Sequence, residues 1–240
     1  MLIEVCANSL ESALNAEKGG ADRIELCSEL GVGGITPSFG LIRSVLERIS
    51  IPVHVLIRPR SGNFTYSEME FEVMLSDIEI CKEMGVSGIV SGALNDKREI
   101  DLEKTSKLVQ ASEGIHFTFH RAFDWLKDPV RSLGQLEDLG VQSILTSGGK
   151  SNVDEGFENL IKLKEAAKRC TIMPGSGVNL ENIAQFKNSG FQAVHFSASK
   201  IIDEVAYEIP VPMNSEKFLQ EHIKTISDDK LIKEMIKKIR

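Results

Sequence analysis

The sequence predicts a (β/α)8 barrel, in which eight parallel strands alternate with eight helices. Short apolar runs and helical stretches follow one another along about the first 200 residues. A glycine recurs just past a helical stretch and shortly before an apolar run, at Gly20, Gly85, Gly140 and Gly190. Glycine suits this position because it adopts positive φ without a Cβ penalty. These glycines lie 50 to 65 residues apart, or about two strand–helix units each, which predicts about eight strands.

The predicted strands are the apolar runs Leu2–Cys6, Arg23–Cys27, Val53–Arg58, Val86–Ser91, Ile115–His120, Val141–Thr146, Thr171–Pro174 and Ala193–Ser197. The predicted helices lie at about 9–18, 38–49, 67–84, 101–112, 129–138, 154–168, 179–188 and 215–238. Two local signals mark helix starts. Pro129 occupies a first-turn position that needs no N–H donor, and Ser67 with Glu70 resembles a capping box.

Strict alternation of strand and helix predicts a parallel sheet with its helices outside. Eight units in about 200 residues, without a second compositional regime, favour a closed TIM barrel over a doubly wound sheet. A doubly wound sheet would carry a glycine-rich dinucleotide turn after its first strand, where Ala7-Asn8-Ser9 stands instead.

The chain is expected to fold as one domain, residues 1–240, with the barrel at about 2–200. A loop at Asp203–Pro212 and a charged helical tail from Ser215 follow. We expect the tail to close the barrel by packing its Leu and Ile residues on it. A contact with a partner or with another copy of the chain is the alternative.

The composition is that of an ordinary globular protein, with 42% hydrophobic and 26% charged residues. No apolar run approaches 18 residues, and no basic segment followed by an apolar one begins the chain, so neither a membrane span nor a secretory signal is predicted. A net charge of -7 with scattered basic residues argues against nucleic acid as a partner. Four cysteines without a CxxC pair predict a reduced, cytoplasmic protein.

The triplet Glu-x-Cys ends each of the first two strands, as Glu4/Cys6 and Glu25/Cys27. Residues two apart in a strand share a face, so each glutamate and its cysteine point the same way, opposite to the apolar neighbours. If the apolar face packs against helices, two carboxylates and two thiols point into the barrel.

The same alternation brings Arg58, His120, His195 and Ser197 to the inward face near the C-terminal ends of their strands. That end is the functional face of a (β/α)8 barrel, whose interior is otherwise filled with branched apolar side chains. Buried charges are costly unless they are paired. One interpretation is therefore an ionic network in which Arg58 pairs with a glutamate. So many polar residues from five strands favour the other interpretation, a functional site.

As an enzyme, the barrel would act on a small anionic metabolite, phosphorylated or carboxylated. Glu4 or Glu25 would be the general acid or base, His120 and His195 would transfer protons, and Arg58 would help to hold the anion.

Glycine-rich turns after the last strands could cradle that anion with backbone N–H groups, or could simply turn the chain tightly. The long loop of residues 59–66 could be a lid over the site or could be anchored by its aromatic residues. The predicted anion-binding residues are Arg60, Ser147, Gly148, Gly175, Gly177 and Ser197.

As a metal-binding protein, the barrel would use Cys6 and Cys27, because thiolates suit Cu(I) and they stand on neighbouring parallel strands. The alternative is that each is a small buried hydrophobe. We expect that role for Cys81 and Cys170, which sit on predicted helical stretches.

The chain resembles the CutC copper-homeostasis family over about residues 2–200. The segments that carry the resemblance are EVCANSLESALNAEKGGADRIELCSEL with GGITPS, IRPRSGNFTYSEMEFEVM, FTFHRAFD, ILTSGG, MPGSGV and VHFSAS. The resemblance implies a cytoplasmic TIM-barrel protein associated with copper tolerance, which binds Cu(I) through the residues that stand here as Cys6 and Cys27. Ser176 departs from the family pattern, where a third glycine is common. A homo-oligomer is a further expectation, whereas a scaffold without a ligand would leave the polar residues unexplained.

Overall fold

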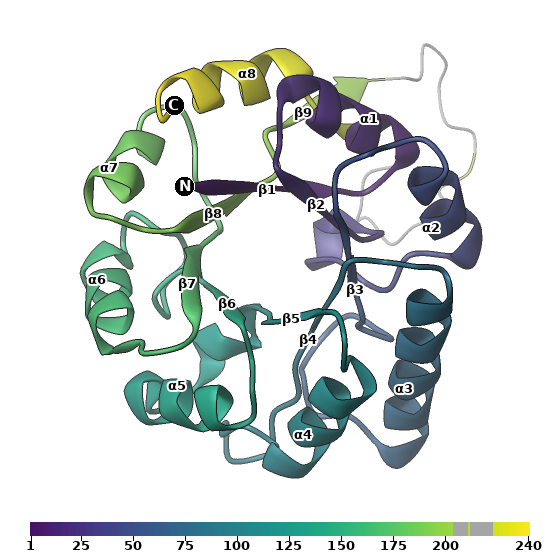
Figure 1. Ribbon diagram of the computed structural model, residues 1–240, viewed down its shortest axis with the longest axis vertical. Coiled ribbons are helices and arrows are strands. Elements are labelled where there is room, and N and C mark those ends of the chain that lie inside the picture. The colour runs from purple at the N-terminus through teal and green to yellow at the C-terminus, as the bar shows by residue number, and fades with distance from the viewer. Residues whose placement is uncertain (204–210, 212–222) are drawn as a thin grey trace.

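A parallel ring of eight strands forms the centre of the computed structural model, which describes residues 1–203, 211 and 223–240 (Figure 1). The strands are β1 (Leu2–Ala7), β2 (Arg23–Leu26), β3 (Val53–Leu56), β4 (Gly88–Ser91), β5 (His116–Phe119), β6 (Ser143–Thr146), β7 (Thr171–Pro174) and β8 (Ala193–Phe196). Hydrogen bonding runs in the order β7-β6-β5-β4-β3-β2-β1-β8, and contacts between β7 and β8 close the ring. The predicted TIM barrel is confirmed.

Helices surround this ring and follow the predicted positions. They are α1 (Leu10–Gly19), α2 (Phe39–Leu46), α3 (Glu68–Glu83), α4 (Leu102–Ala111), α5 (Pro129–Asp138), α6 (Phe157–Ala166), α7 (Ile183–Asn188) and α8 (Asp229–Lys237), with 3-10 turns η1 (Leu30–Val32) and η2 (Arg121–Trp125). Ser67 and Glu70 form the predicted capping box, and Gly20, Gly85 and Gly140 have φ between 83° and 93°. None of the described helices is both long and apolar enough to cross a membrane.

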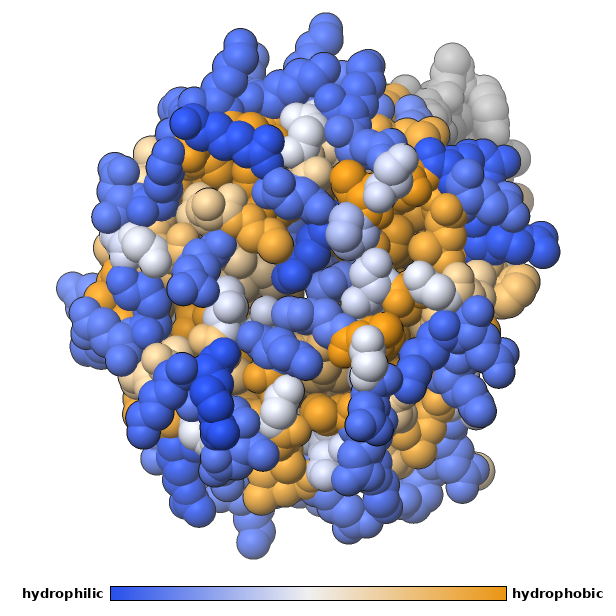
Figure 2. Space-filling model, in the orientation of Figure 1, coloured by the Kyte–Doolittle hydropathy of each residue, from blue (hydrophilic) through white to orange (hydrophobic). Residues whose placement is uncertain are grey.

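The strands separate two environments. Ile3, Val5 and Ile24 are fully buried in the apolar layer between the sheet and the helices. The barrel interior instead contains charged and polar side chains, including Glu4 and His54, which are at most 3% exposed. Outside, hydrophilic residues dominate the periphery of the face in Figure 2, with hydrophobic patches between them.

The C-terminal segment differs from its prediction. Part of the stretch expected as one helix over 215–238 is a strand, β10 (Ile223–Ser227), which pairs antiparallel with β9 (Ser199–Asp203). The β-branched residues Thr225 and Ile226 favour a strand there. The rest of the predicted helix before residue 223 and most of the predicted loop lie outside the described residues.

Helix α8 is the predicted closing helix. It begins after Asp228, whose side chain accepts hydrogen bonds from the backbone N–H groups of Lys230 and Leu231. The helix packs against α1, beside it in Figure 1. Ile232 is fully buried and packs closely on Gly19. A Cβ added to Gly19 would lie 2.5 Å from the Ile232 side chain.

Candidate functional site

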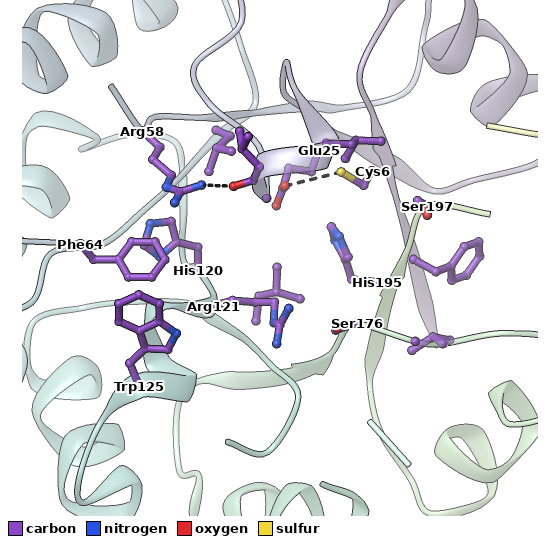
Figure 3. A pocket seen from close by; sticks show the side chains of 18 of the residues that line it. Cys6, Glu25, Arg58, Phe64, His120, Arg121, Trp125, Ser176, His195 and Ser197 are labelled. Atoms are coloured by element: carbon purple, nitrogen blue, oxygen red, sulfur yellow. Dashed lines mark hydrogen bonds between the residues drawn. The ribbon is translucent and has the colours of Figure 1, made fainter. Parts of the chain in front are cut away.

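A cavity of about 750 Å³ opens at the C-terminal ends of the barrel strands. Seven of the predicted site residues line it: Cys6, Glu25, Arg58, His120, Gly177, His195 and Ser197 (Figure 3). The other predicted site residues do not line it: Glu4, Cys27, Arg60, Ser147, Gly148 and Gly175. The tertiary structure therefore brings together residues from strands at opposite ends of the sequence.

Glu4 lies beneath the cavity and is fully buried. The sheet register places it directly between Arg23 of β2 and His195 of β8. Arg23 Nε donates to Glu4 Oε2 at 2.6 Å, and His195 Nδ1 lies 2.8 Å from Glu4 Oε1. Burial by itself would raise the pKa of Glu4, but the hydrogen bond and the positive charges outweigh it and lower the pKa to about 2. Both oxygens are engaged, so Glu4 is placed to orient His195 and not to exchange protons with a ligand.

Arg23, not Arg58, is the cationic partner of Glu4, which corrects the interpretation of a network around Arg58. The Arg58 guanidinium donates instead to the backbone carbonyls of Val32, Gly34 and Gly62, at 2.8–2.9 Å. It therefore ties the loop after β2 to the loop after β3. Arg23 could have been found from the sequence, because it lies two residues before Glu25 and so shares its inward face.

Glu25 and His195 face each other across the cavity floor with complementary charge. Burial raises the pKa of Glu25 to about 7, and its Oε2 has no hydrogen-bond partner among the described residues. Burial would lower the pKa of His195, but the negative charge of Glu25 and the hydrogen bond with Glu4 raise it above its ordinary value. The arrangement can hold a protonated imidazole beside a carboxyl group that titrates near neutral pH.

The thiols of Cys6 and Cys27 lie 3.7 Å apart, as their position on neighbouring strands predicts. Only Cys6 lines the cavity, while Cys27 is fully buried behind it. A hydrogen bond with Cys27, together with burial, raises the pKa of Cys6. Ligand atoms of Cys6, Glu25 and His195 lie within 4.8 Å of one another, so these three residues could hold a metal ion. Cys81 and Cys170 are buried elsewhere, Cys170 in the turn before β7 and not in a helix.

The glycine-rich turn after β6 already holds an anion, the carboxylate of Asp124. The backbone N–H groups of Ser147 and Gly149 each donate to Asp124 Oδ1 at 3.0 Å, and Arg121 Nε donates to Oδ2 at 2.9 Å. The predicted anion-binding residues Ser147 and Gly148 therefore belong to an internal site and not to the cavity.

The turn after β7 and the end of β8 contribute differently. Gly177 and Ser197 line the cavity, whereas Gly175 lies outside it and donates its N–H to the carbonyl of Thr146 at 3.0 Å. Ser176 has φ of 81° and also lines the cavity.

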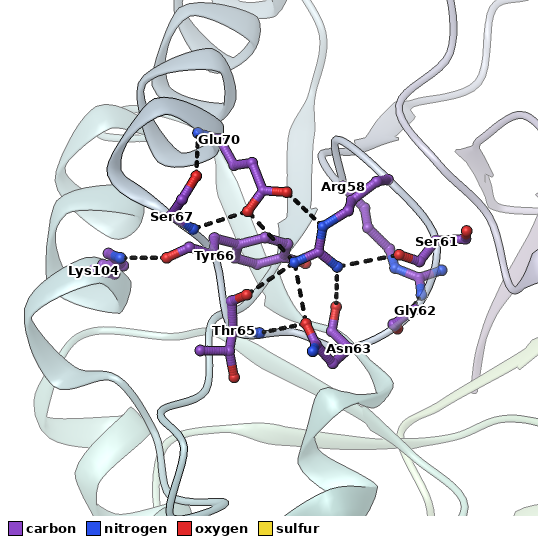
Figure 4. Close-up of polar contacts among 10 residues, drawn as sticks. Arg58, Ser61, Gly62, Asn63, Thr65, Tyr66, Ser67, Glu70 and Lys104 are labelled. Atoms are coloured by element: carbon purple, nitrogen blue, oxygen red, sulfur yellow. Dashed lines mark hydrogen bonds and ion pairs between the residues drawn. The ribbon is translucent and has the colours of Figure 1, made fainter.

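Arg60 organises its own loop and does not line the cavity (Figure 4). Its guanidinium pairs with Glu70 and donates to the carbonyl of Thr65 at 2.9 Å, while Tyr66 in the same loop is 3% exposed. The loop is thus pinned by these contacts, which supports the anchored interpretation. Phe64 at its tip lines the cavity.

An aromatic wall faces the acidic floor. The Phe64 ring centroid lies 4.8 Å from that of His120 and 4.9 Å from that of Trp125. Sequence reasoning assigned no site role to Trp125 or Arg121, although both lie in η2, the 3-10 turn that follows β5. Burial, aided by the charge of Arg58, lowers the pKa of His120 to about 3, so its ring is neutral.

Comparison with known proteins agrees with this architecture. The CutC family model matches residues 1–200. A CutC family protein of Pasteurella multocida is 46% identical over 222 residues, covering 90% of this chain and 91% of the relative. The crystal structure of CutC from Streptococcus agalactiae, a candidate copper homeostasis protein, has a TM-score of 0.77 and 35% identity and covers 82% of this chain and 98% of that one. The aldolase QR15, 12% identical over 82% of this chain and 90% of its own with a TM-score of 0.63, shares the fold alone. The chain therefore belongs to the CutC family.

Proposed function

We propose that this protein serves copper homeostasis by binding Cu(I) at the mouth of its barrel, with Cys6 as the central ligand. The observation that carries the proposal is the convergence of the two thiols at 3.7 Å with the group of Cys6, Glu25 and His195. Thiolate suits Cu(I), and imidazole also binds copper. Cys27, which is buried behind Cys6, supplies the second thiol. A cytoplasmic location and self-association remain predictions from the sequence.

The contact between His195 and Glu4 supports a ligand role for the histidine. A metal-binding histidine usually donates its other ring N–H to a carboxylate, which fixes the orientation of the ring. His195 Nδ1 is engaged by Glu4, so Nε2 is the nitrogen left for a ligand. Because thiol ligands must lose their protons, we expect Cu(I) binding to release protons.

Anaerobic titration with Cu(I) and a competing chelator tests this proposal. We expect Cys6→Ser and Cys27→Ser to weaken the affinity by a factor of 10 or more, on the order of what the loss of site contacts causes at metal centres. Cys170→Ser is the matched control, because that thiol is buried far from the mouth and donates to the carbonyl of Val141. Unchanged Cu(I) affinity in both mouth variants would rule the proposal out.

A second candidate function, an enzyme acting on a small anionic metabolite, is favoured by the size of the cavity. About 750 Å³ is far more than an ion requires and falls within the range of small-molecule sites. Glu25, with its pKa of about 7, would exchange a proton with the ligand. His195, held as an imidazolium by Glu4, would stabilise developing negative charge.

A thermal-shift screen of phosphorylated and carboxylated metabolites tests this candidate. We expect at least one ligand to stabilise the wild-type chain and to be turned over. Glu25→Gln, which keeps the shape of the side chain but cannot act as a base, should retain binding and lose turnover. A screen in which no anionic metabolite stabilises the protein would contradict the enzyme hypothesis and leave the Cu(I) proposal untouched.

A further inference from the structure

We infer that the cavity binds a phosphate group in the turns after β7 and β8, and that its ligand is a phosphate ester whose organic part carries a hydroxyl or carbonyl oxygen. The inference deepens the second candidate function and rests on it for the organic part of the ligand. The phosphate site itself rests on the geometry of the two turns.

The turn after β6 differs in one respect from the turns after β7 and β8. In the turn after β6, the N–H groups of Ser147 and Gly149 are satisfied by the chain's own Asp124 carboxylate. In the turns after β7 and β8, the N–H groups of Gly177, Val178 and Ser197 have no acceptor within the described parts of the chain. These three residues line the cavity. Backbone N–H groups that converge in a turn form a concavity suited to anions.

Two basic side chains, Arg121 and His195, also line the cavity, and Figure 3 shows them near Ser176. The hydrogen bond with Glu4 holds His195 in place, while Arg121 shares its charge with Asp124. An arginine beside unpaired N–H donors suits a phosphate, because guanidinium groups bind phosphate oxygens through charge-assisted hydrogen bonds.

His120 supplies the evidence for an organic part. Its Nδ1 accepts a hydrogen bond from the N–H of Ala122 at 3.3 Å, so the proton of the neutral ring sits on Nε2. His120 is 5% exposed, it lines the cavity, and its Nε2 has no partner among the described residues. A buried donor of this kind calls for an acceptor, which a hydroxyl or carbonyl oxygen of the ligand would provide.

The remaining walls agree with a ligand that spans the cavity. Glu25 Oε2 is buried without a partner and would accept from a ligand hydroxyl. Phe64 and Trp125 present apolar faces against which the carbon skeleton would pack. The phosphate would therefore lie at Gly177 and Ser197, and the carbon chain would run toward His120.

The test follows backbone amide resonances in ¹H–¹⁵N spectra while inorganic phosphate is added. We expect saturable shifts at Gly177, Val178 and Ser197, and none at Ser147 and Gly149, whose N–H groups are already occupied. Ser197→Asp would place a carboxylate where the phosphate binds, as Asp124 does in the neighbouring turn, and should abolish the shifts. Ser197→Asn has the same size without the charge and should retain them.

Several outcomes would overturn the inference: phosphate shifts in the β6 turn, shifts only at surface lysines, or equal phosphate affinity in Ser197→Asp and Ser197→Asn. A thermal melt confirms that both variants are folded. If phosphate binds but no metabolite stabilises the protein, the phosphate site stands and the enzyme hypothesis is contradicted. If a metabolite is turned over but phosphate does not shift these resonances, only the phosphate site is contradicted.

Discussion

At the scale of single residues, the buried pair Arg23–Glu4 governs the site. Glu4 is fully buried, and the basic side chains within 4 Å of its carboxylate among the described residues are those of Arg23, His54 and His195, of which His54 is neutral. Removing one partner of a buried ion pair leaves an uncompensated charge, whereas replacing both partners can be nearly neutral.

We therefore predict that Arg23→Met lowers the free energy of unfolding by about 3–5 kcal/mol. The double variant Arg23→Met/Glu4→Gln should recover much of this loss, because the buried Glu4 charge is then removed together with its arginine partner. Urea unfolding measures both values. Arg169→Ala, which breaks the exposed pair with Asp138, is the control and should change stability by less than about 1 kcal/mol. A double variant that is no more stable than Arg23→Met would contradict the assigned pairing.

At the scale of elements, the polar interior requires a small residue in β4. A Cβ on Gly88 would lie 2.7 Å from the His54 ring, and the ring has no free space to move because it is 3% exposed. Gly40, near the start of α2, has nothing within 4 Å of an added Cβ.

We predict that Gly88→Ala destabilises the barrel by about 1–3 kcal/mol, as overpacking in a core does. Gly40→Ala, the matched control, should be neutral or stabilise by up to about 1 kcal/mol, because alanine favours a helix. Thermal unfolding of the two variants gives the comparison. Equal effects would mean that the space around His54 is not limiting.

The Asp124 carboxylate accepts the backbone N–H groups of the turn after β6, as a bound phosphate would. We predict that Asp124→Ala destabilises the protein by about 1–3 kcal/mol, because the N–H groups of Ser147 and Gly149 then lose their acceptor. Added phosphate should restore part of the loss in this variant more than in the wild type. Melting temperatures of both proteins with and without phosphate test this prediction. If phosphate stabilises the variant no more than the wild type, the Asp124 carboxylate does not occupy an anion site.

At the scale of the whole molecule, buried neutral histidines link stability to pH. Burial lowers the pKa of His54 and of His120 to about 3, and of His116 to about 4, whereas an unfolded histidine titrates near 6.5. Below pH 6.5 the unfolded chain therefore binds more protons at these positions than the native chain does. Their contribution to stability is complete above pH 6.5 and is lost as the pH falls toward the native values.

We predict that the protein is markedly less stable in urea at pH 5 than at pH 7, with each histidine contributing up to about 1.4 kcal/mol per pH unit. Glu25 acts in the opposite direction, because its raised pKa favours the native state at low pH. His54→Leu should reduce the slope of stability against pH. An unchanged slope in this variant would show that His54 is not buried in its neutral form.

The whole molecule also shows why the C-terminal segment was predicted only in part. Its charged sequence suggests one long helix, but Thr225 and Ser227 accept hydrogen bonds from the side chains of Asn8 and Asn15. These tertiary contacts lie more than 200 residues apart in sequence and hold β10 against the start of the barrel. Helix propensity is a weak preference, and such contacts override it.

The sequence by itself determined the barrel, its eight strands and the set of polar side chains at their C-terminal ends. It could do so because these signals are local in the chain. Inward and outward side chains alternate along a strand, and capping residues and terminal glycines mark the ends of helices. The predicted convergence of Cys6, Glu25, His120 and His195 on one cavity follows from those local patterns and from the symmetry of a closed barrel.

Only the tertiary structure decided how these residues are paired. Glu4 is bound to a residue 19 positions away and to another 191 positions away, while Arg58 turns to backbone carbonyls. Which turn already holds an anion depends on whether Asp124 reaches it. Pairing is set by sheet register and by packing between distant segments, which leave no periodic trace in the sequence. The chemistry of the site therefore rests on contacts that exist only once the barrel has closed.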